Sequence, residues 1–283
     1  MPSATLLGQS LLSGVFIGTL YGLLGLGLSL SWGYLRLINL AHFALAVLAA
    51  YLTYHLVGVA GLHPVAALAA IVPIFFLAGA AMQVFFHRFA VGEFASLLVT
   101  FGMTVIIESV IQWIWTADFR RLQLDHGAAS WRLGPLYIPL VEAGMLLVAL
   151  VLTCGMWAML RFTYTGKAMR ASAEDPDMAA AFGVDHRRLA LLVSGLAAAF
   201  AGIAGAFIAM IYTLFPAQIF AWIGVIFAVV ILGGLGNPLG VLIAGLVIGV
   251  SESLTMALTE PAWAPLVSFS LLILVLLLRP DRI

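Results

Sequence analysis

Charge is scarce in this chain: Asp, Glu, Lys and Arg make up 8% of its 283 residues, and twelve acidic residues balance twelve basic ones. A net charge of zero gives no indication of a nucleic-acid partner or an acidic substrate. The single cysteine, Cys154, excludes an internal disulfide. No basic residue precedes Arg36, so the charged start of a cleavable signal peptide is missing, and we expect the first apolar run to be retained.

Motifs for nucleotide binding and hydrolysis are also missing. Gly166-Lys167-Ala168 lacks the earlier glycine and the hydroxyl residue of a P-loop, and neither G-x-S-x-G nor H-E-x-x-H occurs. His42 has no second histidine or cysteine nearby in sequence to complete a metal site. We therefore expect that this chain is not an enzyme and binds no cofactor or metal.

Apolar residues are abundant instead: the hydrophobic fraction is 64% and the mean hydropathy +1.17, whereas soluble proteins are roughly 45–50% apolar. The apolar runs are continuous, which excludes the alternating pattern of a membrane β-barrel. The sequence therefore predicts an all-α, polytopic transmembrane bundle of about eight to nine spans, forming a single domain over residues 1–283. The runs cover about 5–31, 38–58, 64–86, 94–115, 137–160, 189–212, 217–233, 239–258 and 264–278.

The basic residues indicate an orientation. If the charged segment 161–188 lies inside the cell, alternation also places Arg36, Arg88, Arg279 and Arg282 inside. Only the three arginines of the polar loop 116–136 then lie outside. Nine basic residues inside against three outside obeys the positive-inside rule, so we expect the N-terminus outside and the C-terminus inside.

The charged segment 161–188 is the most informative part of the chain, because lipid excludes such a cluster from the membrane. The pattern predicts a helix N-cap at Asp175, a proline in the first turn at Pro176 and an acid favoured by the helix dipole at Asp177. Gly183 is typical of a residue that ends a helix. They predict a short helix over about 176–182. Asp185 is placed to cap the next helix, a span from about 189.

Met178 and Phe182 lie four residues apart, so they share one face of this short helix. Two interpretations remain open. The helix could insert its apolar face into a partner's groove, or it could pack on its own bundle.

Glycines suggest both close packing and a break. Gly14, Gly18 and Gly22, like Gly245 and Gly249, have the four-residue spacing that lets membrane helices approach closely. The run 233–240, which contains Gly234 and Asn237, separates two apolar segments. It is best explained as a tight cytoplasmic turn, with a broken helix beside the solute route as the second possibility.

Few polar residues lie within the apolar runs, and an ionisable group there is costly unless it is paired or hydrated. Five of them are candidates for a functional role: Asn39, His42, Glu108, Gln112 and Glu252. Glu108 and Gln112 are four apart and face the same way. For each carboxyl group, a structural hydrogen bond and a role in a pathway are both open, whereas His42 is interpreted as structural.

Three segments of the chain together carry a resemblance to a known family. The first is 14–22 leading to Ile38-Asn39-Leu40-Ala41-His42. The second is Gly166-Lys167-Ala168-Met169-Arg170-Ala171 followed by Asp175, Ala179, Ala180 and Gly183-Val184, and it is the most specific. The third is 232–240 with Gly249, Glu252 and a terminal Arg279-Pro280. With these segments the chain resembles the bacterial ABC-transporter permeases for branched-chain amino acids, and within them the shorter of the two permease subunits.

The resemblance implies a subunit of the bacterial inner membrane, paired with a second, related permease. Two cytoplasmic ATPases, which would hold ATP and Mg, are expected to bind segment 161–188, and a periplasmic protein would deliver the solute. Coupling residues are then expected at Gly166, Lys167, Arg170, Asp175, Asp177, Met178, Phe182 and Gly183. Pathway residues are expected among Asn39, His42, Glu108, Gln112, Gly234, Asn237 and Glu252.

Two departures leave the solute open. Phe43-Ala44-Leu45 follows His42, where family members usually have glycine and often a polar residue, and the chain stops at Ile283, where relatives commonly continue. The solute is expected to be a branched-chain amino acid or a related small amide or organic acid. An autonomous secondary transporter or channel is the alternative, but ion-coupled carriers usually place several ionisable residues at mid-depth, and only Glu108 and Glu252 qualify.

Overall fold

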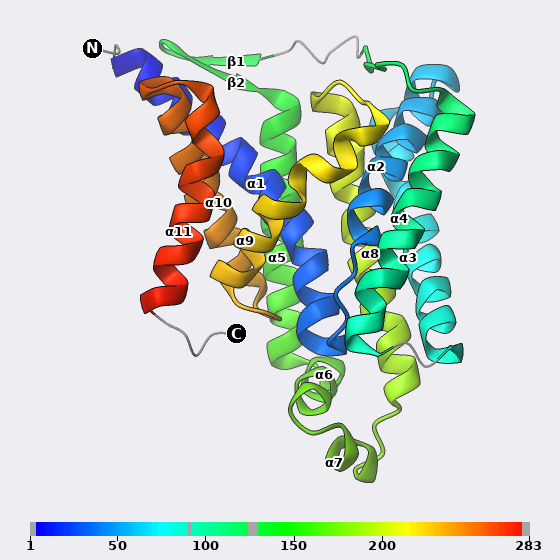
Figure 1. Cartoon of the computed structure of the whole chain (residues 1–283). Coiled ribbons are helices and arrows are strands. Elements are labelled where there is room, and N and C mark those ends of the chain that lie inside the picture. The colour runs from blue at the N-terminus through cyan, green and yellow to red at the C-terminus, as the bar shows by residue number, and fades with distance from the viewer. Residues whose placement is uncertain (1–3, 90–91, 124–129, 279–283) are drawn as a thin grey trace.

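The computed structural model describes residues 4–89, 92–123 and 130–278, so the expected terminal Arg279-Pro280 lies outside the described residues. Figure 1 shows a bundle of long helices with a helical pair protruding from one end. In the described ranges, eight helices are long and apolar enough to cross a membrane, and a ninth apolar helix, Pro261–Val275, is shorter. The predicted polytopic helical bundle is therefore confirmed.

The helices and strands follow one another along the chain in this order. The first half contains α1 (Ala4–Leu35), α2 (Ala41–Tyr54), a π-helical turn (His55–Val59), α3 (Pro64–Arg88), α4 (Glu93–Trp115), β1 (Ser130–Leu133) and β2 (Leu136–Pro139). The second half contains α5 (Leu140–Phe162), α6 (Tyr164–Glu174), α7 (Pro176–Ala181), α8 (His186–Ile211), a 3-10 helix (Pro216–Trp222), α9 (Ile223–Gly233), α10 (Pro238–Leu258), a second 3-10 helix (Pro261–Trp263) and α11 (Ala264–Leu278).

Helices α1, α2 and α8 form the interior, and α3, α4 and α5 expose much more of their surface. Small residues let the inner helices approach closely. A Cβ added at Gly18 in α1 would lie 2.5 Å from the carbonyl oxygen of Gly245 in α10, and one at Gly14 would lie 2.6 Å from the Cα of Val250. The predicted role of these glycines in close helix packing is confirmed.

A β-hairpin replaces part of the expected loop 116–136. β1 and β2 pair antiparallel, with Leu133 opposite Leu136, and Gly134 takes the positive φ of +61° that the tight turn requires. The first residues of the expected apolar run 137–160 therefore belong to a strand. The side-chain amide of Gln9 in α1 both donates to the carbonyl oxygen and accepts from the N–H of Tyr137, each at 3.0 Å, which fixes the hairpin to the N-terminal end of the bundle.

The glycine-rich run 233–240 forms a tight turn between α9 and α10, as the favoured interpretation predicted. Gly234 and Gly236 have φ of +89° and +70°, a region that favours glycine. Asn237 caps α10, its Oδ1 accepting from the N–H of Gly240 at 3.2 Å. The turn packs on the end of α1, because Ser29 Oγ accepts from the N–H of Gly236 at 2.9 Å and Tyr34 Oη donates to its carbonyl oxygen at 3.0 Å.

Candidate coupling surface and membrane pathway

The charged segment 161–188 folds as a helical pair, α6 and α7, that projects beyond the ends of the spans (Figure 1). Each helix start has a side-chain cap: Thr163 Oγ1 accepts from Gly166, Asp175 Oδ1 from Met178, and Asp185 Oδ1 from Arg188, at 3.0–3.1 Å. The predicted caps at Asp175 and Asp185 are therefore present. The predicted helix 176–182 is observed as Pro176–Ala181, and the following span begins at His186, three residues before the expected start.

Contacts to neighbouring elements hold this helical pair in place. Gly166 lies so close to the backbone of Met159 and Leu160 that a Cβ would clash. The ring of His186, at the start of α8, is 2.7 Å from the carbonyl oxygen of Pro176. Gly183 has a φ of +86° and ends α7, as its position in the sequence predicted. The pair is thus anchored at α5 and α8.

Met178 in α7 and Phe182, which directly follows the last residue of α7, project into the surroundings. Their exposed fractions are 56% and 83%, whereas Ala179 between them is buried. The two side chains share a face that the rest of the bundle leaves open. The charged side chains of Lys167, Arg170 and Asp177 are also exposed. The sequence left open whether these two apolar side chains pack on their own bundle. In the structure they do not, because both are exposed.

Asn39 and His42, at the start of α2, are buried inside the bundle. His42 Nε2 lies 2.9 Å from the carbonyl oxygen of Leu24 in α1, and Gly27 makes room for its ring. Asn39 Nδ2 lies 4.0 Å from the sulfur of Met82, and among the described residues its Oδ1 has no hydrogen-bond partner. Both residues therefore sit at contacts between α2 and its neighbours.

Glu252 in α10 is a buried carboxylate with two hydroxyl donors. Tyr21 Oη in α1 donates to Glu252 Oε2 at 2.8 Å, and Ser268 Oγ in α11 donates to Oε1. The carboxylate thus joins three helices. Gly234 and Asn237 lie elsewhere, in the turn before α10.

Glu108 and Gln112 lie on the outward side of α4, where Gln112 is exposed and Glu108 half-buried. Gln112 Nε2 donates to Glu108 Oε1 at 3.3 Å, so the two side chains face the same way, as their spacing predicted. The bulky apolar side chains of Ile106 and Trp113 are exposed on the same helix. The expected pathway residues thus occupy four separate places: the α2 contacts, the α1–α10–α11 contact, the α9–α10 turn and the open surface of α4.

Sequence reasoning gave no role to Glu142, which lines a cavity of about 150 Å³ between α1, α5 and the end of α8, together with Ser13 and Tyr212. Glu142 is the acid in the first turn of α5, directly after the strand that ends at Pro139. The sequence signal for Glu142 was an acidic residue near the start of an apolar run. The cavity itself could not be predicted, because its other lining residues come from α1 and from the end of α8, far away in sequence.

The eight long apolar helices in the described ranges support a multi-pass membrane protein. The chain belongs to the family described as branched-chain amino acid transport system / permease component, whose sequence model matches residues 10–276. The match begins within α1 and ends in the last turn of α11.

Curated relatives agree with this family. The high-affinity branched-chain amino acid transport system permease protein LivH of Escherichia coli K12 is 26% identical over 97% of this chain and 94% of its own length. The probable branched-chain amino acid transport permease protein LivH of Methanocaldococcus jannaschii is 30% identical over 87% and 80%. The permease protein LivM of E. coli K12 is 31% identical over 41% and 27%. No solved structure matches the chain.

Proposed function

We propose that this chain is the membrane-spanning permease subunit of an ATP-driven importer in a bacterial inner membrane. Its solute is a branched-chain amino acid or a related small amide or organic acid, delivered by a periplasmic solute-binding protein. The family and the names of the relatives support this proposal. The N-terminus lies outside and the C-terminus inside, since that orientation puts most of the basic residues in the cytoplasm.

A second, homologous permease completes the membrane part of the importer. The partial similarity to LivM as well as to LivH supports a pair of related chains. Two cytoplasmic ATP-binding subunits supply the drive and hold ATP and Mg, for which this chain has no P-loop. Nucleic acid has no part in this assembly.

The observation that carries the proposal is the pair of exposed apolar side chains on α7. Met178 and Phe182 are presented by a short helix whose start is capped and whose neighbours are fixed by hydrogen bonds. A rigid helix with an open apolar face fits a groove in a partner and transmits its movement to the spans. The exposed charges of Lys167, Arg170 and Asp177 set the orientation of the docked helix.

The solute pathway runs along the open surface of α4. Glu108 and Gln112 form a hydrogen-bonded polar pair there, and polar side chains are costly against lipid. If the second permease packs opposite α4, the pair faces a water-filled route between the two subunits. Asn39, His42, Asn237 and Glu252 position the helices behind that route, since their side chains lie at helix contacts and at the α9–α10 turn.

An autonomous secondary carrier is the competing function. It would need ionisable groups that load and release protons or ions, and Glu252 is already held by Tyr21 and Ser268. Among the described residues of the spans, Glu108 lies on the open surface of α4 and Glu142 lines a cavity at the start of α5, so no cluster of free carboxyl groups lies at mid-depth. This arrangement favours a permease driven by partner subunits.

Affinity purification from native membranes tests the proposal, with each co-purified subunit identified by mass spectrometry. The wild-type chain should recover a second permease and P-loop ATPases, and Phe182→Asp should recover the permease without the ATPases. Phe119→Asp is the matched control, because Phe119 is also exposed but lies in the loop that follows α4. Recovery of an intact wild-type chain alone, or full ATPase recovery by Phe182→Asp, contradicts the proposal.

A further inference from the structure

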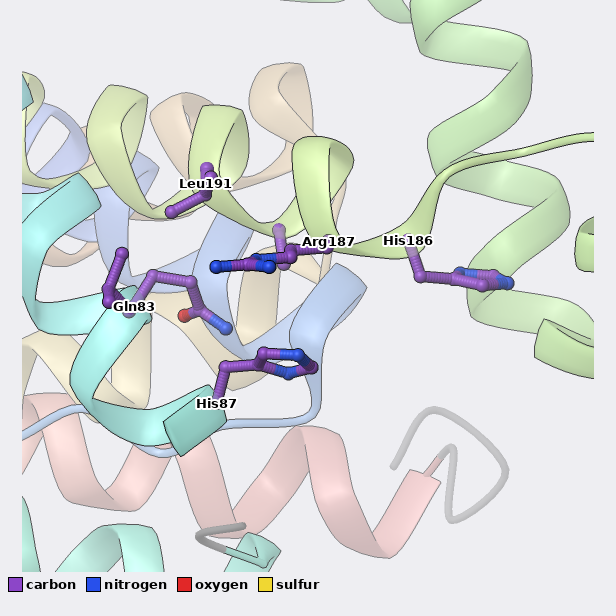
Figure 2. A pocket seen from close by; sticks show the side chains of 7 residues that line it. Gln83, His87, His186, Arg187 and Leu191 are labelled. Carbon is purple, nitrogen blue, oxygen red and sulfur yellow. The ribbon is translucent and has the colours of Figure 1, made fainter. Parts of the chain in front are cut away.

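A cavity of about 160 Å³ lies where the end of α3 meets the start of α8. Figure 2 shows the side chains of Gln83 and His87 from α3 and Arg187 from α8 pointing toward one another. His186 also lines the cavity, but its ring points away, toward its contact with the carbonyl oxygen of Pro176. Three polar side chains from two helices therefore converge on one space.

These polar groups lack partners of their own. Gln83 is only 9% exposed, and among the described residues its Oε1 has no hydrogen-bond partner. A buried amide oxygen in that state is costly, so it calls for a donor. Among the residues that the structure describes, the salt bridges join Arg120 to Asp118 and Arg188 to Asp185, so the guanidinium of Arg187 has no carboxylate partner.

The cavity is placed at the edge of the membrane. The spans Pro64–Arg88 and His186–Ile211 have these residues at their ends, where the apolar helix surface gives way to charge. Val84 and Leu191 line the apolar side of the cavity, and Val84 is 44% exposed. Further along the same helix, Leu77 exposes its apolar side chain. An amphipathic ligand would thus find charge and apolar surface side by side.

We propose that this cavity binds the headgroup of an anionic phospholipid. The phosphate oxygens accept hydrogen bonds from the guanidinium of Arg187 and the imidazole of His87, and the start of α8 adds a favourable dipole. A headgroup hydroxyl, as in phosphatidylglycerol, donates to Gln83 Oε1. The guanidinium of Arg187 disfavours an ammonium headgroup at the same place, because like charges repel. Basic pockets between membrane helices bind lipid headgroups in this way.

Bound lipid would tie α3 to the start of α8. Because His186 contacts Pro176, the same helix start also holds α7 in position. The cavity is separate from the apolar face formed by Met178 and Phe182. Lipid binding can therefore be tested independently of ATPase docking, and it needs no transport assay.

The experiment is a lipid titration of the purified full-length chain in neutral detergent, followed by native mass spectrometry. The probes are phosphatidylglycerol, phosphatidylcholine and inorganic phosphate. Arg187→Gln removes the guanidinium contact to the phosphate. Arg188→Gln makes the same charge change one residue further on, at a side chain that pairs with Asp185 and lies outside the cavity. His87→Gln and Gln83→Leu test the other two groups, and His87→Gln replaces Arg187→Gln if that variant does not fold.

The wild-type chain and Arg188→Gln should each retain one phosphatidylglycerol in preference to phosphatidylcholine. Arg187→Gln should bind it at least about tenfold more weakly, the effect of losing one charge-assisted hydrogen bond. Equal binding by folded Arg187→Gln and wild type overturns the proposal, as does a wild-type chain with no preference for phosphatidylglycerol. Displacement of the lipid by an equal concentration of inorganic phosphate would assign the cavity to free phosphate and overturn the lipid assignment.

Discussion

Arg36 Nη2 donates a hydrogen bond to the carbonyl oxygen of Ala173 at 3.1 Å, which joins the end of α1 to α6. Arg36 itself has a φ of +53°, an uncommon conformation for a residue with a side chain. Two residues earlier, Tyr34 donates to the carbonyl oxygen of Gly236 in the α9–α10 turn. The end of α1 therefore contacts both the helical pair that we propose for ATPase docking and the turn between α9 and α10.

Arg36→Gly should loosen α6 without disturbing the backbone, because glycine accepts the positive φ and only the side chain is lost. Amide hydrogen exchange over residues 164–174 should become about fivefold faster, the result of losing about 1 kcal/mol of local stability. Arg36→Lys keeps the charge but loses the planar donor group, so it should show part of the effect. Unchanged exchange in Arg36→Gly would show that this hydrogen bond does not hold α6.

Gly18→Ala should destabilise the contact between α1 and α10. The added Cβ would lie 2.5 Å from the carbonyl oxygen of Gly245 and 2.7 Å from the Cα of Leu246, and these backbone atoms cannot rotate away. We expect a loss of about 1–3 kcal/mol in the free energy of unfolding, measured by SDS titration in mixed micelles.

Gly155→Ala in α5 is the matched control, because a Cβ there meets nothing within 4 Å. It should leave the stability unchanged or raise it by up to about 1 kcal/mol, since alanine favours a helix over glycine. Equal effects of the two substitutions would contradict the close contact at Gly18.

Tyr21→Phe should destabilise the bundle by about 1–2 kcal/mol, because Glu252 loses one of its two hydroxyl donors. The same SDS titration measures the loss. Tyr54→Phe is the control, since the Tyr54 hydroxyl has no hydrogen bond to any residue that the structure describes. If both variants lose the same stability, the effect comes from the missing hydroxyl as such and not from the contact with Glu252.

Glu108→Gln should change the KM for the solute by less than about tenfold while uptake continues to depend on ATP. The amide keeps the polar contact with Gln112, and the energy for transport comes from partner subunits. Uptake into vesicles with and without a protonophore is the measurement, with Ser109→Ala as a control at the next position, where the hydroxyl bonds to its own helix at Val105. The secondary carrier would be favoured if uptake by the wild type required a proton gradient and uptake by Glu108→Gln no longer depended on that gradient.

Local signals account for what the sequence predicted well. The helix α7 is specified within a few residues by Asp175, Pro176 and Gly183, and continuous apolar runs identify the spans without further context. The glycine spacing predicts close packing because it depends only on helical periodicity. These features need no knowledge of which elements become neighbours.

Tertiary neighbours account for the rest. The spans of Glu108 and Glu252 look alike in sequence, yet one carboxylate lies on an open surface and the other is enclosed by Tyr21 and Ser268. The hairpin depends on a short turn at Gly134 and on its contact with Gln9, far away in the chain. Gln83 and Arg187 meet across about a hundred residues of sequence, so no local pattern could join them.

The central claim is that α7 docks on an ATPase subunit, and cysteine cross-linking tests it most directly. Cys154 is the only cysteine of the chain, so Cys154→Ser gives a clean background for Phe182→Cys and, as a control in the loop after α4, Phe119→Cys. A short thiol-to-amine cross-linker is applied to the assembled complex in native membranes. The account predicts a cross-link from position 182 to a P-loop ATPase and none from position 119. The docking claim would be contradicted if the cysteine at position 182 reacted with a small maleimide but formed no cross-link to an ATPase present in the same membranes.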